Sequence, residues 1–422
     1  MATYIVSELY YPEESATAHY MTCIAEGLVG HSPVHAVCAR PKYDLQWSSL
    51  PPRDTHNSVE IRRCWSTTFD KNRLLGRMVN VVTTCLSMFL VLLQRVRKDD
   101  DVLVVTNPPM LPFVVLAACR LRGARCCLRI DDVYPEAMIH AGLIKPHGLV
   151  ATLVNWMNCR LFRRMQRIIV LGRDMQRLVE QKLGSRSEKV VVIPNWADLD
   201  SVVPGERRKN KLLHEYGLQD KFVIGYAGNI GRVQGIEVLF EAARLLKDVP
   251  DVHFVFVGSG QKVAWLKRAV AEARLENITL PGPRPRADQA DFLNGCDIGI
   301  ISLVRGMSGA GVPSRLYNVM AAGKPVIAAV DADSEPALVV NEESIGWVVP
   351  PDQPDKIVAA ILDAKSNRQR LADMGTRARQ AAEKKYSRER VIKAYENLIG
   401  GWRNEMAKAG TVSSAPGRRT SG

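Results

Sequence analysis

Short apolar runs alternate with longer stretches of helical periodicity along the whole chain. Runs that are apolar on both faces and are separated by helices are typical of parallel strands covered by helices on both sides. The first half contains MATYIV, VHAVCA, DVLVVTN, ARCCLRID, RIIVLG and KVVVIPN, and the second contains KFVIGYAGN, VHFVFVGSG, NITLPGP, DIGIISL, KPVIAAV and IGWVVPP. The pattern predicts an α/β protein with two Rossmann-like, doubly wound domains that face each other across a cleft.

The two halves are separated by a polar stretch, ADLDSVVPGERRKNKLLHEYGLQD. Its Pro204-Gly205 step and the charged run that follows are typical of a linker. We therefore expect one domain over residues 1–197 and a second over 198–385. The chain ends in AGTVSSAPGRRTSG, whose composition indicates disorder over residues 409–422.

The longest apolar segment, MVNVVTTCLSMFLVLL (Met78–Leu93), is shorter than the ~20 residues of a membrane span and contains polar residues. The N-terminus lacks the basic start and apolar core of a signal peptide. Basic residues follow the segment in QRVRK and recur in RLFRRMQR (160–167). The segment is thus either a helix beneath the first sheet or a helix that lies on an anionic membrane surface.

The charge balance of the 422-residue chain is basic, with a net charge of +13. This charge indicates an anionic partner: nucleic acid, acidic lipid or a phosphorylated substrate. No nucleic-acid motif or interleaved aromatic platform accompanies it, so we expect no nucleic-acid partner. The nine cysteines lack metal or disulfide spacing, which indicates a reducing cytoplasm.

Two acidic clusters could suggest a metal site. Asp99–Asp101 precede a predicted strand and so lie at the wrong end of the sheet. DADSE (331–335) is expected to form a solvated loop, with Glu335 nearest the cleft. We expect no essential metal.

Glycine-rich turns follow the predicted strands of the second half, at the edge where parallel sheets bind ligands. The segment GYAGNIGRVQGIEVLFEA places Gly228, Asn229 and Gly231 between a strand and a helix, and VGSGQ places Gly258 after the next strand. Glycines there let backbone N–H groups approach a phosphate. The segments match neither GxGxxG nor a Walker A loop, so tight strand-to-helix turns are an equal alternative.

A third turn, GAGVPSRLYNVMAAGKPVIA (309–328), contains Gly309, Gly311 and Ser314 before a short helix. We expect Pro313 in the first turn of that helix and Gly323 at its end. Arg315 would oppose the helix dipole there at a cost of about 0.3–1 kcal/mol, unless a diphosphate binds at the same place. The alternative is a surface arginine that packs over apolar neighbours.

Several blocks in this order resemble the retaining glycosyltransferases of family 4, which have the GT-B fold. The chain is most similar to the branch that builds O-antigen, capsule or exopolysaccharide repeat units. The blocks are YYPEESATAHYMTCIAEGL, IDDVYPEAMIHAGLI, RIIVLGRDM, VVVIPNWAD, GYAGNIGRVQGIEVL, VPSRLYNVMAAGKPVIA and VVPPDQPDKIVAAI. The resemblance implies that the second domain binds a nucleotide-sugar and the first an acceptor. It also implies that the helix over 386–408 crosses back onto the first domain.

The resemblance further implies catalysis without a protein nucleophile. The departing diphosphate takes the acceptor proton on the same face of the sugar, so configuration is retained. The protein stabilises negative charge on that diphosphate with preorganised donors. Arg315, Arg232 and the amides near Gly228 suit this task. The implied donor is a UDP-sugar, with an N-acetylated amino sugar as the first choice, and no cofactor is implied.

The sequence departs from the family pattern at the paired acidic positions. The second falls at Asn318, which can still hydrogen-bond ribose hydroxyls. The first falls at Ala310, which cannot bind a sugar through its side chain. The family's usual Arg and Lys are replaced by Asn229 and Gln234, for which Arg232 can substitute.

On the acceptor side, Asp131 and Asp132 follow a strand in RIDDVYPE and are candidates to orient the acceptor hydroxyl. An Asx cap before Tyr134-Pro135 is the alternative. Ser15 and Thr17 lie in the diluted acceptor loop PEESATAH, and we expect Trp196 to serve packing.

The implied acceptor is a polysaccharide or a lipid-linked one, such as a polyprenyl-diphosphate saccharide. A cytoplasmic enzyme attached peripherally to the inner face of the plasma membrane would reach the lipid-linked form. Two other functions stay open: a sugar-nucleotide epimerase on the same fold, and a non-catalytic relative that binds a nucleotide-sugar.

Overall fold

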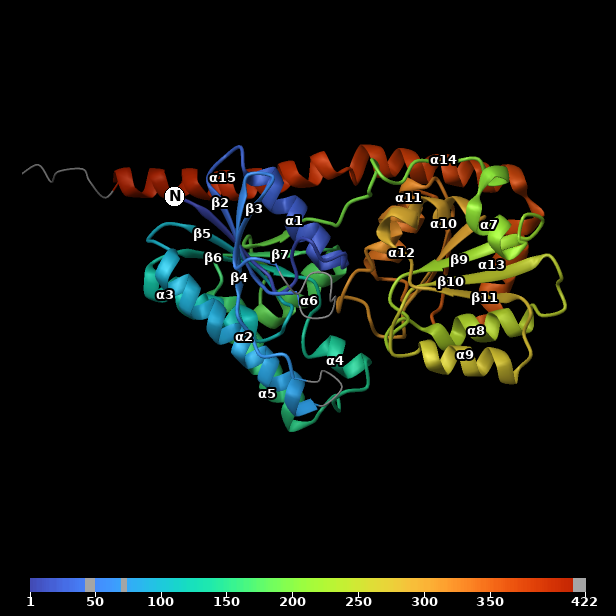
Figure 1. Cartoon of the computed structure of the whole chain (residues 1–422), viewed down its shortest axis with the longest axis horizontal. Helices are drawn as coiled ribbons and strands as arrows, with labels where there is room; N and C mark the ends of the chain where they lie inside the picture. The colour runs from blue at the N-terminus through green and yellow to red at the C-terminus, as the bar shows by residue number, and fades with distance from the viewer. Residues whose placement is uncertain (42–49, 70–73, 413–422) are drawn as a thin grey trace, which may run out of the picture. The chain divides into compact units, whose positions relative to one another are not determined.

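The computed structural model describes residues 1–41, 50–69 and 74–412 and contains two sheets (Figure 1). Every apolar run predicted as a strand forms one. The first sheet has the order β3-β4-β2-β1-β5-β6-β7-β8 and comprises β1 (Thr3–Val6), β2 (Val34–Ala39), β3 (Arg53–His56), β4 (Val59–Cys64), β5 (Asp101–Val105), β6 (Arg125–Ile130), β7 (Arg167–Val170) and β8 (Val190–Val192). The second has the order β11-β10-β9-β12-β13-β14 and comprises β9 (Phe222–Ala227), β10 (Val252–Val257), β11 (Ile278–Gly282), β12 (Ile298–Ser302), β13 (Val326–Ala329) and β14 (Gly346–Val349).

Helices occupy the stretches between the strands, as the alternating pattern predicts. They are α1 (Ala16–Leu28), α2 (Leu74–Arg95), α3 (Leu111–Arg122), α4 (Glu136–His140), α5 (Leu149–Arg164), α6 (Arg173–Leu183), α7 (Lys211–Tyr216), α8 (Ile236–Leu245), α9 (Val263–Glu272), α10 (Gln289–Gly295), α11 (Arg315–Ala321), α12 (Glu335–Glu342), α13 (Pro354–Ser366), α14 (Arg368–Lys385) and α15 (Arg388–Val412). Short 3₁₀ turns cover Arg207–Lys209 and Arg286–Asp288.

The hairpin of β3 and β4 was not predicted from the sequence. It is the antiparallel part of the first sheet, and its turn residues Asn57 and Ser58 have φ of 45° and 64°. Its strands carry charged residues on alternate positions, so they lack the continuous apolar run of the parallel strands. The turn at Asn57 was the available signal, because asparagine tolerates positive φ.

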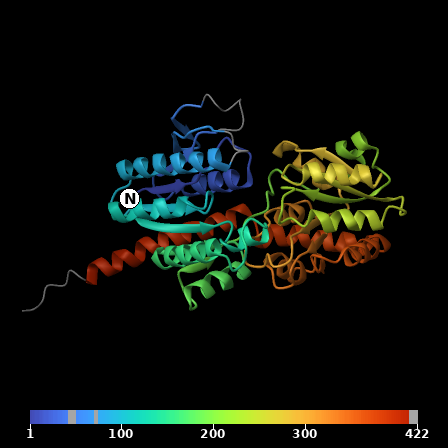
Figure 2. The same cartoon turned by 90° about the horizontal axis from the view of Figure 1, so that it is seen from below.

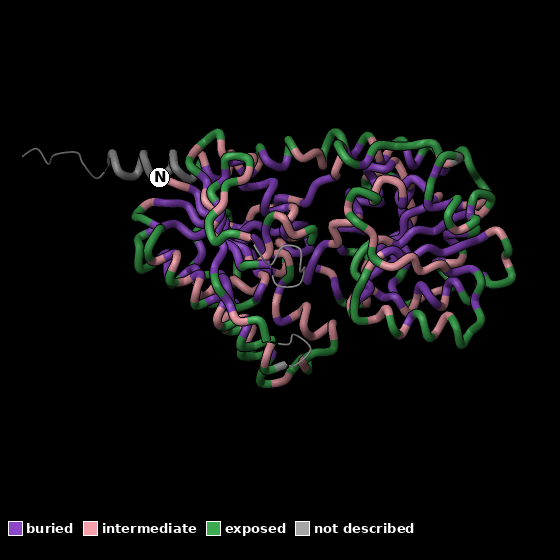
Figure 3. The backbone as a smooth tube through the Cα atoms, viewed as in Figure 1, coloured by how far each residue is buried: buried purple, intermediate pink, exposed green. Residues whose placement is uncertain are grey.

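The second sheet is fully parallel and separates two apolar cores. Along β9, Ile224 and Tyr226 pack with α8, α9 and α13, whereas Val223 packs on the opposite face with α10, α11 and α12. Figures 1 and 2 show α8 and α9 together on one side of this sheet. The inner strands β9, β10, β12 and β13 are buried along most of their length, whereas the edge strands β11 and β14 are mostly half-buried (Figure 3). Burial of both faces explains why these strands have no polar alternation.

The chain forms two compact units, of which the first comprises residues 1–104, 113–127 and 389–422 and the second comprises 105–112 and 128–388. This division differs from the predicted boundary after residue 197. Residues 128–197 fall in the second unit because they bond to its later segments; Val133, for example, donates its N–H to the carbonyl of Ala310 at 2.8 Å.

The stretch predicted as a linker between the halves is instead packed within the second unit. It contains α7, whose N-cap is Asn210, with Oδ1 accepting from the N–H of Leu213. Leu213 and Val202 are fully buried in the core beneath β9. The few apolar residues of this stretch, at helical spacing, are therefore enough to pack it into the core despite its many charged residues.

The end of the chain belongs to the first unit. In α15, Glu396 lies 3.2 Å from His31, and Ile392 packs closely against Gly27 of α1. The helix continues to Val412, so residues 409–412 are helical rather than part of a disordered tail. The remainder of the predicted tail, 413–422, lies outside the described residues.

The apolar segment predicted over Met78–Leu93 forms the longer helix α2, which packs on β2 and β4. Within the described part of the chain, Leu75–Arg95 is the one helix long and apolar enough to cross a membrane by length and composition. The prediction that it is too short to span is therefore wrong as to length. An exposed apolar stripe runs along it: Leu75, Met78, Val79, Val82, Leu86 and Leu90.

Candidate functional site

The glycine turns after β9 and β10 are interlocked at the carboxyl end of the second sheet. Gly228 has φ of 137° and donates its N–H to the carbonyl of Val257 at 2.9 Å. Gly258 has φ of 149°, and a Cβ there would lie 1.8 Å from the Gly228 carbonyl oxygen. Neither position accepts a side chain, so the backbone stays open at this edge.

Arg315, the first residue of α11, is held over these turns by two contacts. Its Nη2 donates to the carbonyl of Ser302 at 3.1 Å, and its guanidinium carbon lies 4.6 Å from the centre of the Tyr226 ring. A Cβ on Gly228 would come within 3.0 Å of Nη1. The half-buried Arg315 is therefore oriented by neighbouring groups and is not a freely solvated arginine.

The Nε–H donor of Arg315 has no acceptor. It is buried and lacks a hydrogen-bond partner among the described residues. A buried unsatisfied donor of a charged group is costly, and an anion beside the guanidinium would offset that cost electrostatically. Beneath the guanidinium, Tyr226 donates to the carbonyl of Asn229 at 2.6 Å and fixes the glycine turn. Burial raises the pKa of Tyr226, so the ring stays neutral under the cation.

The other predicted residues of this loop cluster lie nearby but are less constrained. Asn229 is exposed, and Arg232 is exposed with its Nε donating to Gln261 at 2.8 Å. Gly231 is buried against Asn229 and Gln234, with a Cβ there 2.5 Å from the Gln234 oxygen. The structure thus brings Gly228, Gly258, Asn229 and Arg315 into one region.

The start of α11 and the hydrogen bonds of the segment before it differ from those predicted from the sequence. The helix begins at Arg315, so Pro313 precedes the first turn, and Ser314 makes no side-chain cap bond. Gly323 ends the helix with φ of 64°, as predicted. The N–H of Gly309 donates to Asp174 at 3.0 Å and is therefore engaged within the protein rather than open to a phosphate.

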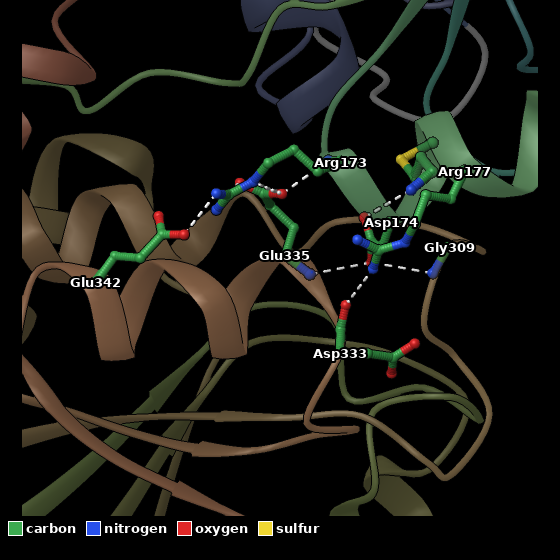
Figure 4. Close-up of polar contacts among 8 residues, drawn as sticks. Arg173, Asp174, Arg177, Gly309, Asp333, Glu335 and Glu342 are labelled. Atoms are coloured by element: carbon green, nitrogen blue, oxygen red, sulfur yellow. Dashed lines mark hydrogen bonds and ion pairs between the residues drawn. The ribbon is translucent and has the colours of Figure 1, made fainter. Parts of the chain in front are cut away.

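Asp174 is a buried carboxylate that joins three backbone segments (Figure 4). Besides Gly309, it accepts from the N–H of Glu335 at 3.1 Å and of Met175 at 2.7 Å. Burial raises the pKa of Asp174, whereas these three N–H bonds oppose the shift. Asp174 was not predicted from the sequence, although its place in the first turn of α6, four residues after the end of β7, was a usable signal.

Glu335, the residue that the sequence analysis set apart from its solvated loop, is buried beside Asp174. Its carboxylate accepts from the N–H of Arg173 at 2.7 Å and from the Arg173 guanidinium at 3.0 and 3.1 Å. Arg173 also donates to Glu342 at 2.6 Å, as Figure 4 shows. The hydrogen bonds that Arg173 donates to Glu342 and Glu335 raise the pKa of Arg173. The bonds tie the start of α6 to α12.

The positions that replace the family's acidic pair are both buried. Asn318 accepts the N–H of Asp198 at 3.1 Å through Oδ1, so its oxygen is engaged within the protein. Ala310 is fully buried and offers only its carbonyl, which Val133 already bonds. Gly311 forms an isolated bridge with Asp132.

The two aspartates after β6 have different environments. Asp131 accepts from the buried Arg129 at 2.9 Å, and Arg129 also donates to Asn195 at 2.8 Å. Asp132 is accessible to solvent but surrounded by protein mass, and this partial desolvation, with the nearby Asp131, raises the pKa of Asp132 to about 7. Neither carboxylate caps α4, whose N-cap is Pro135, so the capping alternative is wrong.

Two further predicted residues lie in the first unit. Ser15 is the N-cap of α1 and accepts the N–H of Ala18 at 3.2 Å, and Thr17 is half-buried in the first turn. Trp196, in the second unit, is buried, in agreement with a packing role. The described residues contain no group of three or more His, Cys, Asp or Glu side chains placed to bind a metal ion.

Comparison with known proteins places this arrangement among enzymes of one kind. Residues 15–196 match the model of the glycosyl transferase 4-like domain, and residues 209–381 match that of glycosyl transferases group 1. The chain is 31% identical over 318 residues to the probable glycosyltransferase WbjE of Pseudomonas aeruginosa, covering 75% of this chain and 78% of that protein. It is 27% identical over 405 residues to the putative colanic acid biosynthesis glycosyl transferase WcaI of Escherichia coli, covering 93% and 98%.

Solved structures share the fold at low sequence identity. Anabaena Alr3699/HepE, in complex with UDP and glucose, has a TM-score of 0.72 and 16% identity, covering 95% of this chain and 100% of that one. WaaG, a glycosyltransferase involved in lipopolysaccharide biosynthesis, has a TM-score of 0.69 and 13% identity, covering 94% and 100%. These matches confirm the predicted GT-B fold.

Proposed function

Since the chain belongs to the group 1 glycosyltransferases of the family 4 type, we propose that it is a retaining transferase of cell-surface polysaccharide biosynthesis. Its donor is a nucleotide-sugar, and its acceptor is a saccharide that is lipid-linked or part of a polysaccharide. The colanic acid role named for WcaI, which aligns with 93% of this chain, supports the polysaccharide assignment.

The observation that carries the proposal is the oriented guanidinium of Arg315 beside two glycine turns. Its Nη1 lies next to Gly228, and Gly228 and Gly258 leave no side chain in the way. A diphosphate at this place would meet a half-buried cation already fixed by Ser302 and Tyr226. Such preorganised donors stabilise the charge that develops on a leaving diphosphate.

UDP is the proposed nucleotide, since Alr3699/HepE was solved with UDP. An N-acetylated amino sugar is the first donor to test. On the acceptor side, Asp132 is better suited than Asp131 to accept a hydrogen bond from the acceptor hydroxyl. Asp131 is occupied by Arg129, whereas Asp132 is accessible to solvent.

The test is to incubate the full chain with labelled sugar nucleotides, with and without a polyprenyl-diphosphate saccharide. We expect acceptor-dependent transfer, retention at the anomeric carbon by NMR, and unchanged turnover in EDTA. A thermal-shift screen would identify the donor, because a bound nucleotide stabilises the protein by RT ln(1 + [L]/Kd). Epimerised donor, or binding without turnover, would instead support one of the two alternatives stated above.

Peripheral attachment to an anionic membrane is the second part of the proposal, since a lipid-linked acceptor cannot leave the bilayer. In the second unit, α5 begins with exposed apolar residues, including Leu149 and Trp156, and ends with exposed Arg163 and Arg164. In the first unit, α2 presents its own exposed apolar stripe. Basic residues near an anionic leaflet contribute about 1 kcal/mol each.

A charge-reversal pair tests this attachment. Arg163→Glu with Arg164→Glu should weaken cosedimentation with anionic vesicles at low salt and leave donor affinity unchanged. The matched control is Lys267→Glu with Arg268→Glu, an exposed adjacent basic pair on α9 that makes the same change in net charge. Equal binding to neutral and anionic vesicles, or equal effects of both pairs, would contradict electrostatic attachment.

A further inference from the structure

The first unit contains a cavity of about 340 Å³ that the proposed reaction does not use. It lies over one face of the strands β1, β2, β4 and β3, at the C-terminal end of α2. Tyr4, His35, Glu60, Arg62, Arg53 and Arg95 are among its lining residues. Tyr4, His35 and Glu60 are register partners across β1, β2 and β4. Arg62 and Arg53 are register partners two residues further along β4, so polar side chains line this face in two adjacent rows.

Three arginines of this cavity lack a counter-charge. Arg53 and Arg62 stand directly opposite each other in the antiparallel pair of β3 and β4, an arrangement in which like charges repel. Arg95 ends α2, whose carbonyl there accepts from Tyr4 at 3.0 Å. Within the part of the chain that the structure describes, none of the three guanidinium groups has an ion pair or a hydrogen bond.

The acidic groups of the cavity are already engaged. Asp54 accepts from the buried Arg63 at 2.9 Å, and this bond lowers the pKa of Asp54. Glu60 lies 3.0 Å from Nδ1 of His35. The cavity therefore offers unpaired guanidinium groups together with a carboxylate–imidazole pair.

We propose that this cavity binds a phosphorylated polyol. The phosphate would lie among Arg53, Arg62 and Arg95, because guanidinium forks match phosphate oxygens. Hydroxyl groups would donate to Glu60. The volume suits a small organic phosphate better than a bare anion. A soluble sugar phosphate and the glycerophosphate headgroup of a phospholipid both have this chemistry.

The site is independent of the proposed transfer reaction. All its lining residues belong to the first unit, whereas Arg315 and the glycine turns belong to the second. Its test therefore uses the full chain with saturating UDP present, so that phosphate binding at the donor site is blocked. Failure of this site would leave the transferase assay unaffected.

Hydrogen–deuterium exchange gives the readout. We expect glycerol 3-phosphate or glucose 6-phosphate to slow exchange in peptides that cover 53–64 and the end of α2, and glycerol to have no effect. In a second arm, phosphatidylglycerol vesicles are compared with phosphatidylcholine vesicles. Protection by soluble esters supports a metabolite site, and protection only by phosphatidylglycerol vesicles supports a headgroup site.

Variants establish that the arginines bind the phosphate. Arg62→Gln should weaken binding about 10- to 100-fold, the range for a lost charge-assisted bond. Arg120→Gln, at an exposed arginine of α3 in the same unit, should leave it unchanged. The hydrogen–deuterium exchange measured on the wild-type protein tests the site even if a variant fails to fold. No protection from any phosphate source, or protection that Arg62→Gln leaves intact, would overturn the proposal.

Discussion

Substitution of Arg315 by alanine separates the structural role of this residue from its role in the reaction. The change removes the bond to the Ser302 carbonyl, the cation–π contact with Tyr226 and the positive charge beside the glycine turns. Loss of the first two contacts lowers the stability of the folded protein. A charge-assisted bond contributes about 1.5–3 kcal/mol when buried and a cation–π contact about 0.5–2 kcal/mol. Because Arg315 is half-buried, we expect the free energy of unfolding to fall by about 1–2 kcal/mol.

The third loss acts on the leaving diphosphate. Removal of one preorganised donor lowers turnover by about 10²–10³, which is about 3–4 kcal/mol of activation free energy. This exceeds the expected stability loss, and a domain with ordinary stability stays folded under assay conditions. Arg315→Lys keeps a charge but lacks the planar fork, so its turnover should lie between those of the alanine variant and the wild type.

The assay is steady-state turnover at saturating donor, together with urea unfolding with and without UDP. Arg244→Ala is the matched control, because Arg244 of α8 is exposed and forms a surface pair with Glu241 at 2.7 Å. Surface pairs of this kind contribute about 0–1 kcal/mol. If Arg315→Ala turns over within a few-fold of the wild type at saturating donor, the phosphate role is refuted.

Two further predictions concern the carboxylates of the second unit. Asp174→Ala leaves three buried N–H groups without an acceptor and should lower the free energy of unfolding by about 3 kcal/mol, whereas Asp333→Ala, at an exposed neighbour, should change it by less than about 0.5 kcal/mol. Equal urea midpoints for the two variants would contradict this account. The folded-state pKa of Asp132, raised to about 7, means that stability declines as pH rises from about 4 through 7. Asp132→Asn should therefore gain stability over the wild type between pH 5 and pH 8, and a constant difference would rule out the raised pKa.

Local features of the sequence predicted the strands and the position of Arg315 beside the glycine turns. A parallel strand buried on both faces has an apolar run that can be recognised without its partners, as in β2 and β10. Arg315 could be recognised because a strand end, a glycine turn and a helix start occur within a few residues. The same local reasoning missed the hairpin of β3 and β4, whose exposed positions carry charge.

Contacts between distant segments could not be predicted from local pattern. Gly309 was expected to expose its N–H, but its partner Asp174 lies 135 residues earlier in the chain. Asn318 was expected to bind ribose, but its oxygen is taken by Asp198, 120 residues away. In each case the competing partner is set by tertiary packing, which periodicity and spacing do not encode.

The return of α15 to the first unit has a consequence for synthesis on the ribosome. Residues 1–104 emerge first, yet Ile392 and Glu396, which pack against Gly27 and pair with His31, are translated only after the whole second unit. The first unit therefore completes its packing last. Until then, the surface of α1 around Gly27 lacks its covering helix. A nascent chain halted before residue 388 would carry a nearly complete second unit and a first unit that still lacks α15.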